Sequence, residues 1–262
     1  MQFIKKNRRL YNLLWFIKEQ LGINPRSFFN TIMNVSKYLI QYFKFKSNFS
    51  GKIALKPCLQ DFEENSGVVN EYTMQDLFVS QKIYQSNPNK HVDIGSRIDG
   101  FITAVAAFRS IEVLDIRPLE IYDQNISFNQ IDIFDDNIPK NYCDSLSCLH
   151  TIEHFGLGRY GDKLHSKPLE QGLKSLSGLL LNNGKLYLST LIGEEKVEFN
   201  ANWIFDYDRV LTIANSNHLN LSEVFYYDSS KKIVKPLTNS KNLDKNYNLV
   251  IFIFEKTQHE NI

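Results

Sequence analysis

The sequence predicts an α/β fold in which a mostly parallel sheet is covered by helices on both faces. Short apolar runs alternate with helix-like stretches through the middle of the 262-residue chain, as in sheets whose two faces are both buried. Near the end, two strand-like runs follow each other without a recognisable helix, which indicates an antiparallel pair at a sheet edge. Residues 1–50 precede this pattern and predict a separate helical extension.

Each expected element is an apolar run or a helical repeat bounded by turn residues. The expected strands cover residues 91–94, 111–116, 128–133, 144–150, 185–191, 219–227 and 248–255. The expected helices of this part cover residues 70–86, 99–109, 118–124, 151–156, 168–181 and 203–216. Asn182-Asn183-Gly184 supplies a helix-stop and turn signal just before the fifth strand.

The extension predicts two amphipathic helices that break near Asn24-Pro25. Residues 1–46 contain nine Lys or Arg and one acid, Glu19, so their net charge is +8, whereas the remainder carries −7. Basic helices rich in aromatic residues are typical of anionic membrane surfaces, so we predict peripheral contact with the inner face of the membrane through residues 1–46. The alternative is a helical cap that packs on the domain or on a second copy in a homo-oligomer.

Composition opposes several other classes of protein. The three cysteines form no CxxC pair, which opposes a disulfide framework or a structural zinc site and fits a reducing, cytoplasmic location. No apolar run approaches the ~18–20 residues of a membrane span, and no small-residue cleavage site follows the early apolar run, as a signal peptide would require. We expect no nucleic-acid partner and no bound metal.

The stretch HVDIGSRIDGF places a glycine turn between an expected strand and an expected helix. Such a turn gathers backbone N–H groups and the positive end of a helix at one point. Gly95 allows a tight turn and close approach of a ligand, and Asp99 is placed to cap the helix that follows. Asp115, 20 residues after Gly95, ends the next strand where an acid can bind ribose hydroxyls. The pattern predicts an adenosine site; the alternative is a structural turn with an incidental acid.

Arg97 stands where a dinucleotide-binding loop has its middle glycine. A pyrophosphate needs close approach there, so NAD is disfavoured, whereas the guanidinium could bind the carboxylate of S-adenosylmethionine. A buried structural or solvent-facing Arg97 is the alternative. Asp132, expected to close the third strand, is placed to accept from an adenine amino group, and the Ile133 N–H to donate to a ring nitrogen. No Tyr-x-x-x-Lys pair follows the fourth or fifth strand, which further weakens an NAD-dependent oxidoreductase.

The stretch CDSLSCLHTIEHFGLGRYGD is the densest in polar groups. His150 falls at the carboxyl end of the fourth strand, where ligands bind in open α/β sheets, and His154 lies four residues later on an expected short helix. Methyl transfer to a hydroxyl needs positioning and a base, so His150 is the first candidate base and His154 the second, with Glu153 orienting one of them. The candidate acceptor contacts are Gln75, Arg159, Tyr160 and Asn200.

Two alternatives remain for the same stretch. HTIEH matches the H-x-x-E-H pattern of inverted zinc peptidases, but that site needs a sustained helix and a further acidic ligand. Here a strand precedes the motif, and Gly156, Gly158 and Gly161 follow it. In the other alternative, both histidines only cap and hydrogen-bond.

These motifs resemble those of class I S-adenosylmethionine-dependent methyltransferases. VDIGSRIDG is similar to their first motif, EVLDIRP to the second, IDIFDDNIP to the third and DSLSCLHTIEH to the fourth. The chain resembles more closely an uncharacterised methyltransferase-like family with a VDIGSR-DGF loop, an H-EH-GLGRYGD stretch and an FNA segment, here EFNANWIF at 198–205. MQDLFVSQKI, 74–83, is similar to that family's helix before the first strand. The resemblance covers about residues 55–255.

The resemblance implies a Rossmann-like, seven-stranded methyltransferase sheet with an antiparallel final strand and S-adenosylmethionine as cofactor. By position, the cofactor would be lined by Asp93, Gly95, Ser96, Arg97, Gly100, Asp115, Ile116, Asp132 and Ile133. Many family members belong to surface-polysaccharide pathways (capsule, O-antigen or related glycans), which implies a glycan or nucleotide-sugar hydroxyl as acceptor.

The predicted domains are a basic helical extension over 1–50, a helical lead-in over 51–89 and a methyltransferase domain over 90–257. Arg97 departs from the family's glycine and leaves cofactor binding open. The alternative function is therefore a catalytically silent scaffold that docks through the N-terminal helices.

Overall fold

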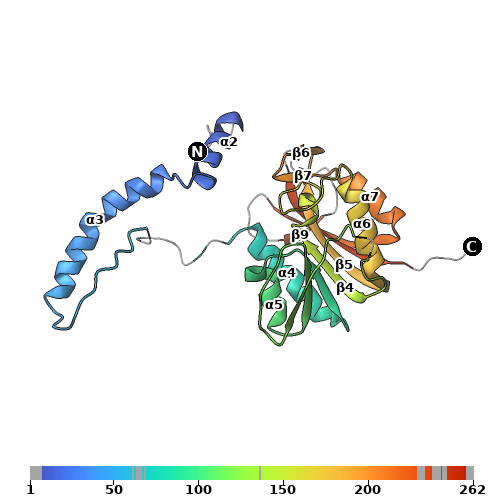
Figure 1. Cartoon of the computed structure of the whole chain (residues 1–262), viewed down its shortest axis with the longest axis horizontal. Coiled ribbons are helices and arrows are strands. Elements are labelled where there is room, and N and C mark those ends of the chain that lie inside the picture. Colours follow the sequence, from blue (N-terminus) through green and yellow to red (C-terminus); the bar gives the residue numbers. More distant parts are fainter. Residues whose placement is uncertain are drawn as a thin grey trace, which may run out of the picture. The chain divides into compact units, whose positions relative to one another are not determined.

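The computed structural model describes residues 8–60, 62, 67, 69–135, 137–228, 234–237, 243 and 247–257 (Figure 1). The chain divides into two compact units, Met1–Val68 and Val69–Ile262. The lead-in predicted over 51–89 is therefore shared between the two units. The predicted three-part division itself stays a prediction.

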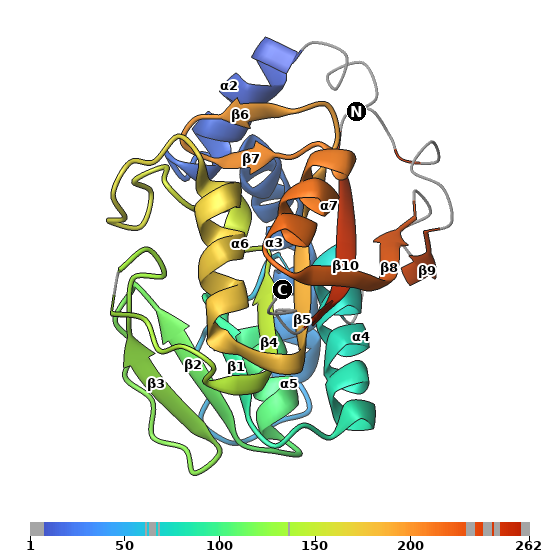
Figure 2. The ribbon, with the colours of Figure 1, turned by 90° about the vertical axis from the view of Figure 1, so that its right-hand side faces the viewer.

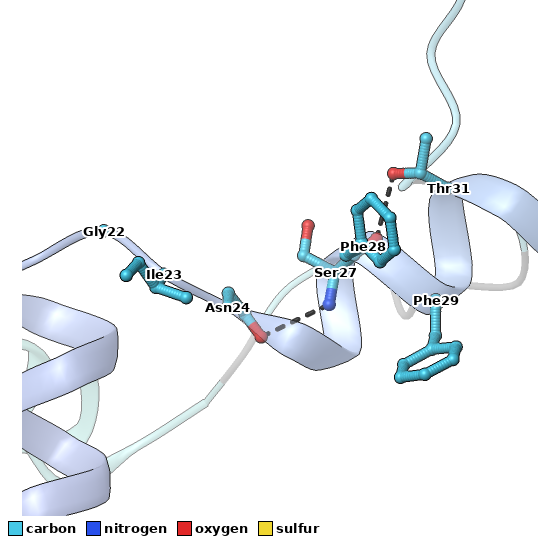
Figure 3. Close-up of a pocket in the computed structure, with 7 residues that line it drawn as sticks. All are labelled: Gly22, Ile23, Asn24, Ser27, Phe28, Phe29 and Thr31. Carbon is cyan, nitrogen blue, oxygen red and sulfur yellow. Dashed lines mark hydrogen bonds between the residues drawn. The ribbon is translucent and has the colours of Figure 1, made fainter.

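The first unit contains two helices, α2 (Arg8–Glu19) and α3 (Pro25–Lys46), which confirms the predicted break at Asn24-Pro25. The Asn24 side chain caps α3 by accepting from the backbone N–H of Ser27 at 3.2 Å, and proline is favoured at the first helical position because it has no N–H to satisfy. Figure 3 shows the hollow beside this break. It is lined by Gly22, Ile23, Asn24, Ser27, Phe28, Phe29 and Thr31, none of which is titratable.

The second unit is built on a mixed sheet with the strand order β3-β2-β1-β4-β5-β10-β8-β9. The strands are β1 (His91–Ile94), β2 (Ile111–Asp115), β3 (Ile126–Gln130), β4 (Cys143–Leu149), β5 (Leu180–Ile192), β8 (Leu219–Tyr227), β9 (Val234–Pro236) and β10 (Asn248–Lys256). Strands β1 to β5 are parallel, and β10 is antiparallel to both β5 and β8. This confirms the predicted seven-stranded sheet with its late antiparallel strand, to which the three-residue β9 is added at the edge.

Helices cover both faces of this sheet (Figure 2). They are α4 (Glu71–Ser86), a π-turn η1 (Ile98–Ile102), α5 (Thr103–Ala106), a 3₁₀ turn η2 (Ile152–His154), α6 (Pro168–Leu179) and α7 (Tyr207–Ser216); a separate hairpin pairs β6 (Lys196–Glu198) with β7 (Asn202–Ile204). Val92 packs in one core with Leu169 of α6, and Val79 of α4 packs in the other with Val113. Because side chains alternate along a strand, Asp93 faces the α4 side.

Several predicted elements differ from the structure. The fifth strand begins at Leu180, ahead of the turn predicted at Asn182-Asn183-Gly184, and the helix predicted over 203–216 begins at Tyr207, because Asn202–Ile204 pairs in the hairpin as β7. Residues 118–124 form no helix, because the Asp123 side chain accepts from the Asn125 N–H at 2.8 Å and makes a turn instead. The third strand ends at Gln130, because the Asp132 side chain accepts from the Phe134 N–H at 2.9 Å and forms a second turn. The stretch predicted as a helix over 151–156 is only the short turn η2.

Candidate active site

The glycine turn after β1 is held in place by the buried side chain of Asp93. Asp93 is fully buried and accepts from the Ser96 N–H at 2.9 Å, the Ser96 hydroxyl at 2.8 Å and the Ser147 hydroxyl at 2.5 Å. Burial raises the pKa of Asp93 to about 7. Gly95 has φ +70°, and a Cβ there would lie 2.4 Å from the Thr151 methyl carbon, so only glycine fits. Asp93 and Ser96 therefore shape the turn.

The buried network continues to a histidine that the sequence analysis missed. His91 Nδ1 lies 2.8 Å from the Ser145 hydroxyl, and its Nε2 lies 3.2 Å from the Ser147 hydroxyl. Burial lowers the pKa of His91 to about 3, so the ring is neutral near pH 7. These partners come from β1 and β4, and only the register of that strand pair brings them together.

Asp115 lies at the tip of β2, as predicted, but its carboxylate is already engaged. It accepts from the Arg117 backbone N–H at 2.8 Å, from Nε at 3.0 Å and from Nη2 at 2.5 Å. Arg117 Nη2 also donates to the Gly95 carbonyl at 3.2 Å, and its Cζ lies 4.8 Å from the centre of the Tyr160 ring. The Arg117 guanidinium thus bridges the tips of β1 and β2, where the ribose is expected. Its sequence signal, a base two residues after a strand-ending acid, was overlooked.

Arg97 and Asp99 form an exposed pair. Arg97 Nε and Nη2 donate to the two Asp99 oxygens at 3.0 and 2.6 Å, and the two side chains are 80% and 62% exposed. The prediction that Asp99 caps the following helix is wrong. Asp99 lies inside η1, and its carboxylate accepts from Arg97. A solvated pair of this kind is weak, so a ligand carboxylate could exchange with Asp99.

The other predicted cofactor residues lie around the same tips. A Cβ at Gly100 would stand 2.5 Å from Asp76 Oδ2, so this glycine lets α4 approach η1 closely. Ile133 is buried in the core under α6, and the Ile116 carbonyl accepts from the Gln130 side chain at 2.8 Å. Asp132 lies in the turn after β3 rather than at the strand end. The cofactor contacts of these residues stay predictions.

His150 is presented at the end of β4 with one ring nitrogen held and the other without a partner. Its φ of +50° turns the chain sharply, and its side chain is 9% exposed. Nδ1 lies 2.6 Å from Glu153 Oε1, while the buried Nε2 has no hydrogen-bond partner among the described residues. Because the Glu153 carboxylate can only accept, Nδ1 is the nitrogen that donates to it, and in the neutral form of the ring Nε2 is the nitrogen that can accept a proton.

The carboxylate behind His150 is itself anchored. Glu153 is 1% exposed, and its Oε2 accepts from the Thr190 hydroxyl of β5 at 3.1 Å. Burial acts to raise the pKa of Glu153, but the attraction and hydrogen bond of His150 outweigh it, so the pKa falls below its usual value. The Tyr72 ring of α4 lies 4.4 Å from that of His150, and partial burial with the Glu153 charge raises the pKa of Tyr72 to about 12. Thr190 and Tyr72 were not predicted.

His154 contacts the turn between β6 and β7 and the glycine-rich loop rather than His150. The prediction that it shares a short helix with His150 is wrong, because η2 begins at Ile152, after the chain has turned at His150. His154 Nδ1 lies 2.8 Å from the Ala201 carbonyl, and burial lowers the pKa of His154. Arg159 Nη1 donates to the same carbonyl at 3.1 Å. The sustained helix of a zinc peptidase is therefore not formed.

Several of these side chains pack around the Tyr160 ring. The centres of the His154 and Tyr160 rings lie 5.8 Å apart in an edge-to-face arrangement, and the Arg159 Cζ lies 5.2 Å from the Tyr160 ring centre. Together with Arg117, these contacts tie the loop over 156–161 to the tip of β2. Among the described residues, no group of three or more His, Cys, Asp or Glu side chains is arranged to hold a metal ion.

The two remaining acceptor candidates differ in accessibility. Gln75 is 2% exposed; its carbonyl oxygen accepts from the Ser189 hydroxyl, which in turn accepts from the His150 N–H at 3.0 Å. Gln75 therefore supports the backbone of His150. Asn200 is exposed in the turn between β6 and β7, next to Ala201. Contact of either residue with an acceptor stays a prediction.

Solved structures share this architecture at low sequence identity. N-methyltransferase NodS from Bradyrhizobium japonicum WM9, in complex with S-adenosyl-L-homocysteine, is 12% identical, with 72% of this chain and 89% of that chain covered and a TM-score of 0.50. Geranyl diphosphate methyltransferase in complex with SAM is 11% identical, with coverages of 71% and 85% and a TM-score of 0.50. The second unit has the class I methyltransferase fold. No family model and no curated protein matches this sequence.

The fold alone does not fix the chemistry. The [4+2]-cyclase SpnF is as similar as the two methyltransferases, at 9% identity, coverages of 69% and 80%, and a TM-score of 0.51. One fold thus carries unrelated reactions, and the reaction must be argued from the residues at the strand tips.

Proposed function

We propose that this protein is an S-adenosylmethionine-dependent O-methyltransferase that acts on a sugar hydroxyl in surface-polysaccharide biosynthesis. One observation carries the proposal. At the carboxyl end of β4, His150 presents a buried Nε2 without a partner among the described residues, while Glu153 holds Nδ1. A nitrogen placed in this way can accept a proton from a hydroxyl, and methyltransferase-fold ligands lie at these strand tips.

The chemistry divides between cofactor and protein. S-adenosylmethionine, when bound, supplies an electrophilic methyl group on a sulfonium that leaves readily. His150 Nε2 would take the hydroxyl proton as the acceptor oxygen forms its bond to the methyl carbon and the bond from that carbon to sulfur breaks. Glu153 would stabilise the resulting imidazolium, and the Thr190 hydroxyl would keep Glu153 in place.

The tips of β1 and β2 offer a fit for the nucleoside once Arg117 moves. Gly95 leaves the backbone open to a ligand, and Asp93 fixes the turn that presents it. Asp115 is the natural partner for two ribose hydroxyls, but both of its oxygens now accept from Arg117. Arg117 is 40% exposed at its side chain, so it has room to leave.

The acceptor class rests on the family resemblance and on the loop beside the base. Arg159 and Tyr160 flank His154 near the Ala201 carbonyl, and these polar groups suit a hydroxyl-rich ligand. A cytoplasmic location, where nucleotide sugars are made, belongs to the same proposal.

A catalytically silent scaffold is the second candidate. It is favoured by the same ion pair, since Arg117 fills the place of the ribose and Arg97 is paired with Asp99. In that case the fold would serve only to display the N-terminal helices.

Titration calorimetry with S-adenosylhomocysteine separates the two candidates. We expect micromolar binding by the full-length protein and at least about ten-fold weaker binding by Asp115→Ala, because two charge-assisted hydrogen bonds to the ribose are lost. Asp208→Asn, an exposed acid on α7, is the matched control and should bind like the original protein. Absence of binding by the original protein would favour the scaffold.

A binding protein can then be tested for transfer. Incubation with S-adenosylmethionine carrying a labelled methyl group and a panel of nucleotide sugars should label at least one sugar. Label on an amine or on protein, but on no sugar, would contradict the proposed acceptor.

A further inference from the structure

Helix α3 has an apolar face that no described residue of its own unit covers. We define the α3 stripe as Phe28, Phe29, Ile32, Met33, Ile40 and Phe43, whose spacings of three, four and seven residues place them on one side of a helix. Within the chain, each of these residues is between 54% and 73% exposed. Exposed apolar side chains gathered on one face of a helix indicate an interaction site.

The chain's own strap lies on the other side of α3. Asn34 Nδ2 donates to the Leu59 carbonyl at 2.8 Å, and Gln60 Nε2 donates to the Ser27 carbonyl at 3.0 Å and to the Thr31 hydroxyl. Ser27, Thr31 and Asn34 are spaced by four and three residues, so they form a polar face that is opposite the stripe at 100° per residue. The local contacts of the unit therefore satisfy the polar face and leave the apolar one.

The charge of residues 1–46 favours one of the partners that could cover this apolar face. Residues 1–46 carry nine basic residues and one acid, so the same segment of a second copy would bring a further +8 against the first. An anionic surface complements that charge. α2 adds Leu13, Leu14, Trp15 and Phe16, which are 43% to 54% exposed and of the apolar and aromatic types that enter a lipid interface.

We infer that α2 and α3 dock on an anionic lipid bilayer, with the α3 stripe in the interface and the lysines at the headgroups. Basic side chains can bury their stems along an apolar surface while the charge stays in water, so Lys44 suits the border of the stripe, whereas the Lys37 Nζ lies 4.7 Å from the centre of the Phe62 ring. Among the helices that the structure describes, none is long and apolar enough to cross a bilayer. The inference does not depend on the proposed reaction.

Flotation of the full-length protein with lipid vesicles tests this inference. We expect the protein to float with phosphatidylcholine vesicles that contain about one third phosphatidylserine, to stay behind with pure phosphatidylcholine, and to be released as salt rises to about 0.5 M. Ile40→Glu should lower the bound fraction about ten-fold because it places a charge in the stripe. Gln41→Glu adds the same charge one residue away, on the polar face, and should change binding less than about two-fold.

Circular dichroism will check that both variants keep their helices, and light scattering will measure their mass. No flotation with anionic vesicles overturns the inference, as does an equal loss for the two variants. A dimer that Ile40→Glu splits into monomers also overturns it, because the stripe would then bind a second copy.

Discussion

The tip of β4 and the tips of β1 and β2 lie at the same edge of the sheet, but they satisfy their polar groups differently. At β4, Glu153 and Thr190 hold one side of His150, and its Nε2 has no partner among the described residues. At β1 and β2, internal partners already hold the carboxyl groups: Ser96 and Ser147 hold Asp93, and Arg117 holds Asp115. The end proposed to hold the base leaves a nitrogen open to a ligand, and the end proposed to hold the cofactor is closed by the protein itself.

This difference has an energetic reason. A buried nitrogen without a hydrogen bond costs free energy, so it persists only where the surrounding structure over-determines it. Here the rigid strand β5 and the carboxylate of Glu153 provide that support. A carboxylate such as Asp115 costs far more to leave unpaired, and the Arg117 guanidinium neutralises it.

The largest expected effect is at the open end. His150→Asn removes the base while keeping a residue that tolerates φ of +50°. We expect kcat for methyl transfer to fall by about 10²–10⁴-fold. Binding of S-adenosylhomocysteine should stay within about three-fold, because the substitution leaves the β1 and β2 tips intact. Labelled-methyl transfer and calorimetry measure the two quantities.

His218→Asn, at a histidine directly before β8 with φ of +59°, is the matched control and should keep full activity. An unchanged kcat in His150→Asn would remove His150 from the role of base and leave the open nitrogen unexplained.

The sequence predicted the open end better than the closed one, for a physical reason. His150 and Glu153 are three residues apart, so their pairing is local and visible in a motif. Ser147 and Asp93 are neighbours only through the register of two parallel strands, which a single sequence does not display. Arg117 is local to Asp115, but its contact with Tyr160 joins segments 43 residues apart.

The same division holds for the fold. Strands at 91–94 and 219–227 were predicted to the residue because turn signals bound each apolar run. The third strand was placed too far along the chain, since alternation over 128–133 fits a strand equally well. There the side chain of Asp132 decides, by capping a turn. Side-chain-to-backbone bonds of this kind compete with strand pairing and leave only a weak sequence signal.

The second prediction concerns the closed end, where Asp93 should make the folding stability depend on pH. The pKa of Asp93 is about 7 when folded against an ordinary value of 3.8, so the folded state binds this proton more tightly. The stability from that proton is full below about pH 4 and is lost as pH rises through about 7. In Asp93→Asn this loss is absent. Relative to the original protein, the variant should gain on the order of 4 kcal/mol between pH 4 and pH 8.

Urea unfolding across this pH range measures the difference. The contribution of His91, which has the opposite sign, is present in both proteins, so the difference between them reports residue 93 together with its coupling to His91 through Ser147. A difference in stability that stays constant with pH would mean that Asp93 is ionised in the folded protein, contrary to its burial.

The smallest effect tests whether the closed end opens for a ligand. Arg117 occupies both oxygens of Asp115 and the Gly95 carbonyl, so a nucleoside must displace the guanidinium before its ribose can bind. Arg117→Ala should therefore bind S-adenosylhomocysteine about ten-fold more tightly by calorimetry, since the ligand no longer breaks an ion pair. Arg209→Ala is the control. It removes an arginine of α7 that pairs with Glu170 of α6, and it should change binding less than about two-fold. Weaker binding by Arg117→Ala would show instead that Arg117 positions Asp115 for the ribose. Binding by Arg117→Ala alone, and not by the original protein, would show that this ion pair is what separates a silent scaffold from an enzyme of the same fold.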